Sequence, residues 1–406
     1  MSRSSDIFRK ATLGCGLALA MSGAADAGQV NVLYAFQGGT DGAGPSPGVI
    51  SDSQGNLYGT TAQGGGTGCN DGQGCGTVFR VTPDGTETVL YAFQGGPGGQ
   101  FPYTGLARDK DGNIYGVTGG GTDDSGTGNN CNCGAVFKLA PDGTETVLHT
   151  FSGGSDGAYP AAGLLVDKRG NLFGTTSGGG NRNCANEPHG CGTVFKIAPD
   201  GTESVIYAFC AQANCADGAG PASALTADKA GNLYGTTSYG GSIIEGGTVF
   251  RLAPNGTETV LYSFCQVQPN CQDGQSPMAG VTLDQAGNLY GTTYQGGSFF
   301  GFGAVFKLAP DGTETVLHSF SKIDGLSPTS GVIVDQAGDL YGTTANALKC
   351  KYEGTVYRLS PDGSEKLSCL PGQTYGGVVE KNGTLYGTGF SPGEDSDGFV
   401  FAIKKH

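Results

Sequence analysis

Residues that could carry out chemistry are concentrated in one polar segment near the middle of the chain. Glu187 and His189 lie between Cys184 and Cys191, and Arg182 precedes the first of these cysteines. A His close to a carboxylate can act as a general base, and an Arg can hold an anion. The segment therefore predicts Arg182, Glu187 and His189 as candidate catalytic residues. The alternative is a solvated loop whose charges take no part in chemistry.

A second group consists of Asp-Gly pairs that are each followed shortly by Pro. The pairs begin at Asp41, Asp156, Asp217, Asp273 and Asp324. Carboxylates arranged around a ring could bind Ca²⁺ or a cationic ligand, because Ca²⁺ takes oxygen ligands. An Asp in a turn can instead accept hydrogen bonds from nearby backbone N–H groups, and the repetition favours this interpretation. No cofactor is evident beyond a Ca²⁺ ion at these carboxylates.

Aromatic residues between the regular segments are candidates for ligand binding, because exposed rings can stack on the faces of sugars. The candidates are Tyr103, Tyr159, Tyr239, Tyr294, Phe299 and Phe300. The sequence contains no Trp, which weakens this interpretation. The alternative is that the rings fold over the edges of neighbouring strands.

The 13 cysteines indicate an oxidising compartment. Twelve of them follow Cys15, mostly in close sets: Cys69, Cys75, Cys131, Cys133, Cys184, Cys191, Cys210, Cys215, Cys265, Cys271, Cys350 and Cys369. Such spacing predicts local disulfides. Metal binding is the alternative, but only four His residues are present. Loops closed by short bridges are stiff, and a stiff loop loses less entropy when it binds a ligand.

The N-terminus predicts export. Two Arg and one Lys precede a short apolar stretch, and Ala-Asp-Ala at 25–27 fits a signal-peptidase site. We therefore expect a signal peptide over 1–27 and a mature domain over 28–406. A buried N-terminal helix is the alternative. The mature protein would be secreted, periplasmic or displayed on the cell surface.

Charge and hydropathy exclude several classes of partner. The formal net charge is −14, which repels nucleic acid and anionic lipid surfaces. After the N-terminus there is no apolar run of roughly 20 residues, the length that a membrane-spanning helix needs. We therefore expect no nucleic-acid partner and no membrane insertion, and we expect a monomer that binds an extracellular polymer or protein ligand.

A repeat organises the whole chain. The phrase Gly-Asn-Leu-Tyr-Gly-Thr-Thr begins at Gly55 and recurs to give seven copies at intervals of 45 to 61 residues, the last being degraded. A second phrase follows each copy and contains a turn such as Pro83-Asp84-Gly85. The alternation of residues and the absence of helical periodicity predict two hairpins per repeat. His149 and His318 replace Tyr in predicted fourth strands and are interpreted as packed strand residues and not as ligands.

The two ends of the chain predict a closed ring. Residues 398–404 are typical of a third strand without its fourth, and residues 30–36 are typical of a fourth strand alone. Pairing them would complete one blade and cover both free edges. The sequence therefore predicts an all-β fold: a single seven-bladed β-propeller of four-stranded antiparallel blades, closed by the N-terminal strand. Its long, variable loops share one face, where we expect function.

The two recurring phrases resemble the bacterial Gloeo/Verruco (GloVer) tandem repeat family over residues 30–403. The resemblance implies an exported repeat protein and assigns no functional residue. We predict a secreted or surface-displayed binding propeller that recognises an extracellular polymer such as a polysaccharide. One alternative is an exported propeller enzyme, namely a polysaccharide lyase or hydrolase or a Ca²⁺-dependent phosphatase or lactonase. The other is a structural or adhesive coat protein.

Overall fold

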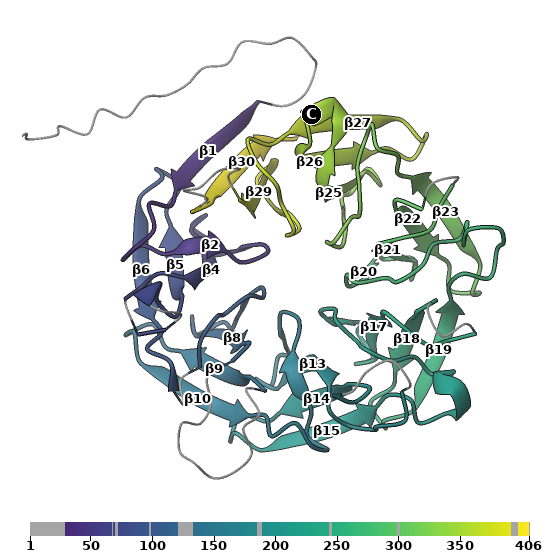
Figure 1. Cartoon of the computed structure of the whole chain (residues 1–406), viewed down its shortest axis with the longest axis horizontal. Coiled ribbons are helices and arrows are strands. Elements are labelled where there is room, and N and C mark those ends of the chain that lie inside the picture. The colour runs from purple at the N-terminus through teal and green to yellow at the C-terminus, as the bar shows by residue number, and fades with distance from the viewer. Residues whose placement is uncertain are drawn as a thin grey trace, which may run out of the picture.

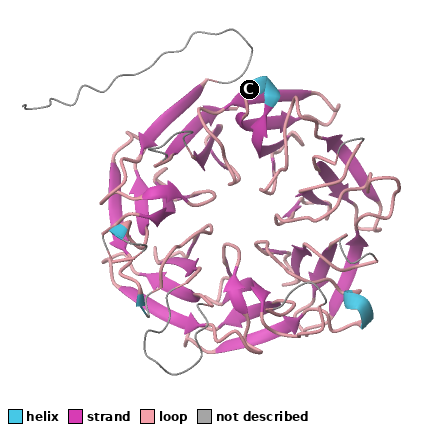
Figure 2. Cartoon of the chain, viewed as in Figure 1, coloured by secondary structure: helices cyan, strands magenta, loops and turns pink. Residues whose placement is uncertain are grey.

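The described structure is a computed structural model that covers 29–66, 68–69, 72–96, 99–120, 133–184, 189–242, 246–298, 301–390 and 397–405. The predicted signal peptide lies outside these residues. Seven sheets surround a central axis (Figure 1), and strands and loops make up almost all of the fold (Figure 2). No helix in the described ranges is both long and apolar enough to cross a membrane. The predicted all-β, seven-bladed propeller is confirmed.

Blades one to four follow each other along the chain. Blade one comprises β2 (Ala43–Pro45), β3 (Ile50–Ser51), β4 (Leu57–Gln63), β5 (Thr77–Val81) and β6 (Glu87–Ala92). Blade two comprises β7 (Ala107–Arg108), β8 (Ile114–Thr118), β9 (Ala135–Leu139) and β10 (Glu145–Thr150). Blade three comprises β11 (Ala158–Pro160), β12 (Leu165–Val166), β13 (Leu172–Gly178), β14 (Thr193–Ile197) and β15 (Glu203–Ala208). Blade four comprises β16 (Thr226–Ala227), β17 (Leu233–Thr237), β18 (Thr248–Leu252) and β19 (Glu258–Ser263).

The remaining three blades complete the ring, and within the described ranges two short 3-10 helices lie in its loops. Blade five comprises β20 (Thr282–Leu283), β21 (Leu289–Thr293), β22 (Ala304–Leu308) and β23 (Glu314–Ser319). Blade six comprises β24 (Ile333–Val334), β25 (Leu340–Ala347), β26 (Glu353–Leu359) and β27 (Glu365–Cys369). Blade seven comprises β28 (Val379–Lys381), β29 (Thr384–Gly389), β30 (Phe399–Lys404) and β1 (Val30–Ala35). The helices are η3 (Ala213–Cys215) and η4 (Leu348–Cys350).

Ring closure joins the two ends of the chain. Strand β1 pairs antiparallel with β30, from Val30 opposite Ile403 to Ala35 opposite Phe399. The pairing confirms that the N-terminal strand completes the last blade. A further bond closes the inner side of the ring, where the Thr388 hydroxyl donates to the Ser46 carbonyl oxygen at 2.9 Å. Both edges that a linear array would leave open are therefore covered.

The core explains why Gly follows Tyr in the repeated phrase. A Cβ at Gly59 would lie 2.5 Å from Cζ of Phe79, so the ring of the third strand packs directly on the second strand. Phe79 in turn meets Phe36 from blade seven edge to face, with ring centroids 5.0 Å apart. Equivalent pairs join successive blades, ending with Phe320 and Tyr357 at 5.2 Å. Aromatic pairs therefore hold neighbouring blades together.

The polar residues of the phrase stabilise its turns and strands. Asp52, which ends β3, accepts hydrogen bonds from the Asn56 side chain at 2.8 Å and from the Tyr58 hydroxyl at 3.0 Å. Thr61 and Thr77 share a hydroxyl hydrogen bond of 2.8 Å between β4 and β5. These buried groups are all paired, as the interior of a stable fold requires.

Disulfides stiffen the face that carries the long loops. The bonded pairs are Cys69–Cys75, Cys184–Cys191, Cys210–Cys215, Cys265–Cys271 and Cys350–Cys369. Cys133 is also disulfide-bonded, and its neighbour Cys131 lies outside the described residues. The prediction of local disulfides is confirmed for the four closely spaced pairs, and the remaining two cysteines, Cys350 and Cys369, bond to each other. The four local bridges lie in links between blades or in loops after a second strand, whereas the fifth joins η4 to the end of β27.

Candidate functional site

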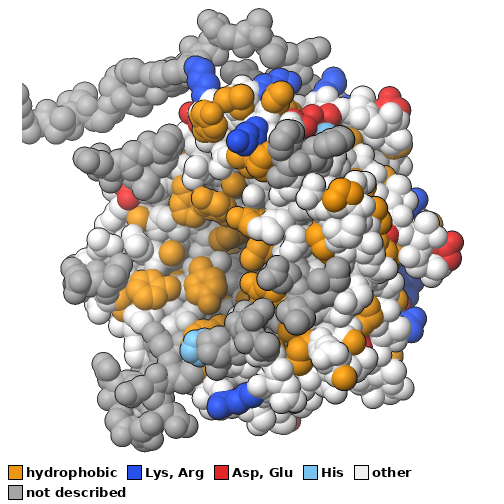
Figure 3. Space-filling model, turned by 45° about the vertical axis from the view of Figure 1, so that its right-hand side comes forward, with side chains coloured by type: hydrophobic (Ala, Val, Ile, Leu, Met, Phe, Trp, Pro, Cys, Tyr) orange, Lys and Arg blue, Asp and Glu red, His pale blue; other side chains and the backbone are white. Residues whose placement is uncertain are grey.

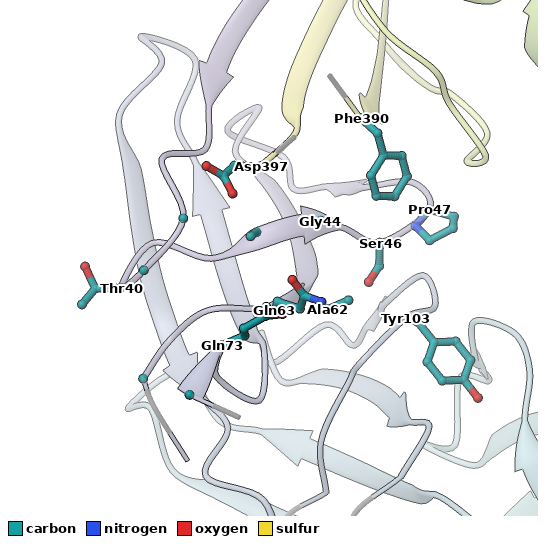
Figure 4. A pocket seen from close by; sticks show the side chains of 15 residues that line it. Thr40, Gly44, Ser46, Pro47, Ala62, Gln63, Gln73, Tyr103, Phe390 and Asp397 are labelled. Carbon is teal, nitrogen blue, oxygen red and sulfur yellow. The ribbon is translucent and has the colours of Figure 1, made fainter. Parts of the chain in front are cut away.

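A slot over blade one forms a cavity on this face. Its volume is about 700 Å³, which lies within the usual range for small-ligand sites. Figure 4 shows the rings of Phe390 and Tyr103 on opposite sides of Ser46 and Pro47. Phe390 follows β29 of blade seven, and Tyr103 comes from the link into blade two. Two neighbouring blades thus supply aromatic walls to a slot whose floor belongs to blade one.

The floor is open because blade one carries small residues there. Gly44, Ser46 and Ala62 line the slot. At the repeat position of Ser46, the two neighbouring blades carry the larger Tyr103 and Tyr375. Small residues between large ones therefore produce a groove flanked by rings.

The aromatic walls are held in place by their own contacts. The ring of Tyr103 packs directly over Gly119, where a Cβ would overlap it. Tyr103 keeps 38% of its surface exposed, and burial, followed by the nearby Tyr159 hydroxyl, raises the pKa of its phenol. Phe390 contacts the ring of Tyr375, with centroids 5.7 Å apart. Both walls are therefore supported from behind and offer one surface to a ligand.

Polar groups line the rest of the slot. The carboxamides of Gln63 and Gln73 and the hydroxyl of Thr40 are among them. The hydroxyl of Ser46 is already occupied, since it donates to the Pro102 carbonyl oxygen at 2.5 Å. Among the described lining residues, Asp397 carries the one carboxylate. Hydroxyls, carboxamides and aromatic rings of this kind can offer a ligand hydrogen bonds and stacking surfaces.

Two of the predicted candidate residues, Tyr159 and His189, contact each other on blade three. The rings of Tyr159 and His189 lie edge to face with centroids 5.4 Å apart, and Tyr159 is close enough to Tyr103 to affect its pKa. Arg182 is exposed, and Glu187 lies outside the described residues. A catalytic role for Arg182, Glu187 and His189 stays a prediction.

The other aromatic candidates lie along the same face. Tyr239 keeps 36% of its surface exposed and pairs through its backbone with Ala219. Tyr294 is half-buried, and its N–H donates to the Ser276 carbonyl oxygen at 3.1 Å. Phe299 and Phe300 lie outside the described residues. Figure 3 shows hydrophobic side chains across the middle of the face in view and charged ones mainly towards its edge.

The predicted aspartates accept hydrogen bonds from the inter-blade links in which they lie and from residues of the outer strands. Asp217 is fully buried and accepts hydrogen bonds from the Tyr207 hydroxyl at 2.7 Å and from the N–H groups of Ala211 and Gln212 at 2.9 and 3.1 Å. Asp41 and Asp273 likewise accept from tyrosines of outer strands. The turn interpretation accounts for these bonds, and Ca²⁺ binding stays a prediction.

His replaces Tyr at two of these junctions. Asp156 lies 3.5 Å from Nε2 of His149, and Asp324 lies 3.0 Å from Nε2 of His318. Both aspartates also accept a hydrogen bond from a Ser backbone N–H. These two carboxylates therefore stabilise the same kind of turn as the other aspartates, but their partner in the outer strand is a His instead of a Tyr.

A glutamate from the following blade adds a second carboxyl group to most junctions. Burial first, and then the neighbouring Asp217, raises the pKa of Glu258 to about 7. The pKa of Glu314 is raised to about 7 in the same way beside Asp273. Sequence reasoning missed these pairs, because each Glu lies in the turn region of a different repeat from its Asp.

Among the slot residues, Tyr103 was predicted, whereas Phe390 and Gln63 were missed. The available signal was the difference between repeat copies at one position: blade one has Ala62 where blade seven has Phe390. That comparison becomes informative only when the blades are known to be adjacent in the closed ring.

Known proteins resemble this chain in sequence and in fold. The family model described as the Gloeobacter/Verrucomicrobia repeat matches residues 16–186, 122–271, 184–370 and 247–406. A comparison with curated proteins found no match.

Three solved structures illustrate the likeness in fold. The extracellular domain of a protein from B. thetaiotaomicron, described as a one-component system, has 10% identity and a TM-score of 0.54, covering 90% of this chain and 39% of that one. PorZ, a surface component of the type-IX secretion system of Porphyromonas gingivalis, has 17% identity and a TM-score of 0.52, with 87% and 46% covered. A gluconolactonase from Xanthomonas campestris has 17% identity and a TM-score of 0.43, with 77% and 85% covered. This chain thus spans less than half of the first two proteins. On the family match, the chain belongs to the Gloeobacter/Verrucomicrobia repeat family.

Proposed function

We propose that this protein is an exported binding propeller that recognises an extracellular polymer, most simply a polysaccharide, in the slot over blade one. The observation that carries the proposal is the pair of aromatic walls, Phe390 and Tyr103, on either side of a small-residue floor. Sugar rings have apolar faces that stack on aromatic side chains and hydroxyl edges that need hydrogen-bond partners. Gln63 and Gln73 also line the slot, and a carboxamide can both donate and accept hydrogen bonds.

The stiffness of the loops supports the same function. The Cys69–Cys75 disulfide lies in the loop that carries Gln73. The Gly64 N–H donates a 2.8 Å hydrogen bond to the Gln73 carbonyl oxygen. A preformed slot loses less entropy on binding than a mobile one. Disulfides agree with an exported protein, and two propellers of similar fold are described as extracellular or surface proteins.

The test is binding of the mature protein to an array of polysaccharides, followed by affinity measurements on the best ligand. Phe390→Ala and Tyr103→Ala should each raise the Kd about tenfold, which corresponds to about 1.4 kcal/mol. Tyr352→Ala is the matched control, because this exposed tyrosine belongs to the blade-six loop and does not line the slot. The control should bind like the wild type.

Two results would overturn the proposal. Binding that is unchanged in both wall variants would place the ligand elsewhere on the molecule. Shortened or unsaturated glycans in the bound fraction, detected by mass spectrometry, would show turnover and favour an enzyme. Retention of intact glycan that depends on both rings is the expected result.

A further inference from the structure

At the junction between blades five and six, three side chains with metal-binding atoms come close together. His318 lies in β23, Asp324 in the link that follows, and Glu365 begins β27. One ligand atom from each lies within 4.8 Å of the other two, and among the described residues this is the one set of three or more His, Cys, Asp and Glu side chains that meets so closely. From this geometry we propose that His318, Asp324 and Glu365 form a Zn²⁺ site.

The distances fit the proposed ion. Zn²⁺ binds His nitrogen and carboxylate oxygen at about 2.0–2.2 Å in tetrahedral geometry, which separates neighbouring ligand atoms by about 3.4 Å. Nε2 of His318 lies 3.0 Å from Oδ2 of Asp324 and 3.6 Å from Oε1 of Glu365. These distances lie on either side of the tetrahedral value. Three protein ligands leave a fourth position for water, as in many zinc sites.

The charges and orientation of the three groups agree with a cation. Two carboxylates face one imidazole nitrogen, and each side chain keeps only about a fifth of its surface exposed. Oε1 of Glu365 is buried without a hydrogen-bond partner among the described residues. The Ser321 hydroxyl donates to Oδ1 of Asp324 at 2.6 Å, which orients this carboxylate as groups around metal ligands commonly do. On binding, the proton between His318 and Asp324 would leave to solvent.

The chain contains its own control. At the junction between blades two and three, His149, Asp156 and Glu203 occupy the same repeat positions. There Nε2 of His149 lies 3.5 Å from Oδ2 of Asp156, and the three side chains do not meet as a set. Tyr stands at the His position in four other junctions, so a His-to-Tyr change restores a residue that the fold already accommodates.

The experiment uses the mature protein after dialysis against EDTA and then into chelator-free buffer. ZnCl₂ is titrated by calorimetry and by thermal melting. We expect about one equivalent bound, and a rise in Tm of about 3 °C when free Zn²⁺ is about a hundredfold above Kd. His318→Tyr and Glu365→Gln should each lower the affinity at least tenfold. His149→Tyr should bind Zn²⁺ like the wild type.

Every outcome decides the proposal. Loss of binding in His318→Tyr and Glu365→Gln, with melting of the metal-free variants still cooperative, would support the site. No binding by the wild type would overturn it, as would binding that survives His318→Tyr or that is lost in His149→Tyr. The site lies in outer strands and its test uses no glycan, so its failure would leave the proposed slot untouched.

Discussion

Replacing Glu258 by Gln should stabilise the protein at alkaline pH and leave it unchanged at acid pH. Neither carboxylate oxygen of Glu258 has a hydrogen-bond partner among the described residues. Burial first, and then the charge of Asp217, raises its pKa from 4.5 to about 7. The folded protein therefore keeps a proton that the unfolded chain releases between these two values.

The sign and size of the effect follow from this difference. A raised pKa means that the stabilising contribution is complete below pH 4.5 and is lost as the pH rises through about 7. The full shift corresponds to about 3 kcal/mol, but the side chain is only partly buried, and solvent screening reduces the expected value to about 1–2 kcal/mol. Gln cannot ionise, so the variant should gain about 2 °C in Tm at pH 8.

Urea denaturation from pH 4.5 to 8 measures the free energy of unfolding of the variant and of the wild type. In the difference between the two, the contributions of all other titrating groups cancel. Glu145→Gln is the control. Its pKa is raised by burial alone, and the link into blade two carries no Asp, so its gain at pH 8 should be smaller. Equal gains in the two variants, or a pH slope unchanged by Glu258→Gln, would refute the role assigned to Asp217.

Two further predictions concern the core. Gly174→Ala should lower stability by about 1–3 kcal/mol in urea denaturation, because its Cβ would lie 2.5 Å from Cζ of Phe195 and 2.8 Å from Cδ2 of Leu164; a variant as stable as the wild type would contradict the packing. Tyr357→Phe should raise the free energy of unfolding by about 1–2 kcal/mol, because it removes a buried hydroxyl that has no partner among the described residues; a destabilised variant in thermal melts would contradict this reasoning.

The ring could be predicted from the sequence because every repeat contains the same turn and packing residues. Each Pro-Asp-Gly or Pro-Asn-Gly turn and each Gly beneath a Phe ring restricts the backbone within one blade, and seven copies of a blade leave few ways to close. The β1–β30 pairing followed from two incomplete end fragments. Four of the five disulfides followed from close spacing, whereas the bond between Cys350 and Cys369, which are 19 residues apart, did not.

The candidate site could be predicted only in part, because it is made between blades. Tyr103 was named from its ring, but its opposite wall, Phe390, lies 287 positions further along the chain. The walls become neighbours only after the ring closes. Asp217 was named as a candidate, but its pairing with Glu258 was missed for the same reason, since no local pattern shows that the start of one outer strand meets the link before it.

Comparison of equivalent positions around the ring indicates which residues are candidates for function. Positions that are alike in nearly all blades, such as the Gly beneath Phe79, are accounted for by packing alone. Packing does not explain a residue that differs in type from its counterparts in the other blades when the difference leaves the blade geometry unchanged. Phe390 stands where five other blades carry Ala, Gly or Ser; it leaves the pairing of β29 with β30 regular and forms one wall of the slot. His318 leaves the pairing of β22 with β23 like that of other blades, and among the described residues it is the His whose imidazole meets two carboxylates as a set. Both departures change surface chemistry without changing the fold, which is the pattern expected of functional substitutions on a repeated scaffold.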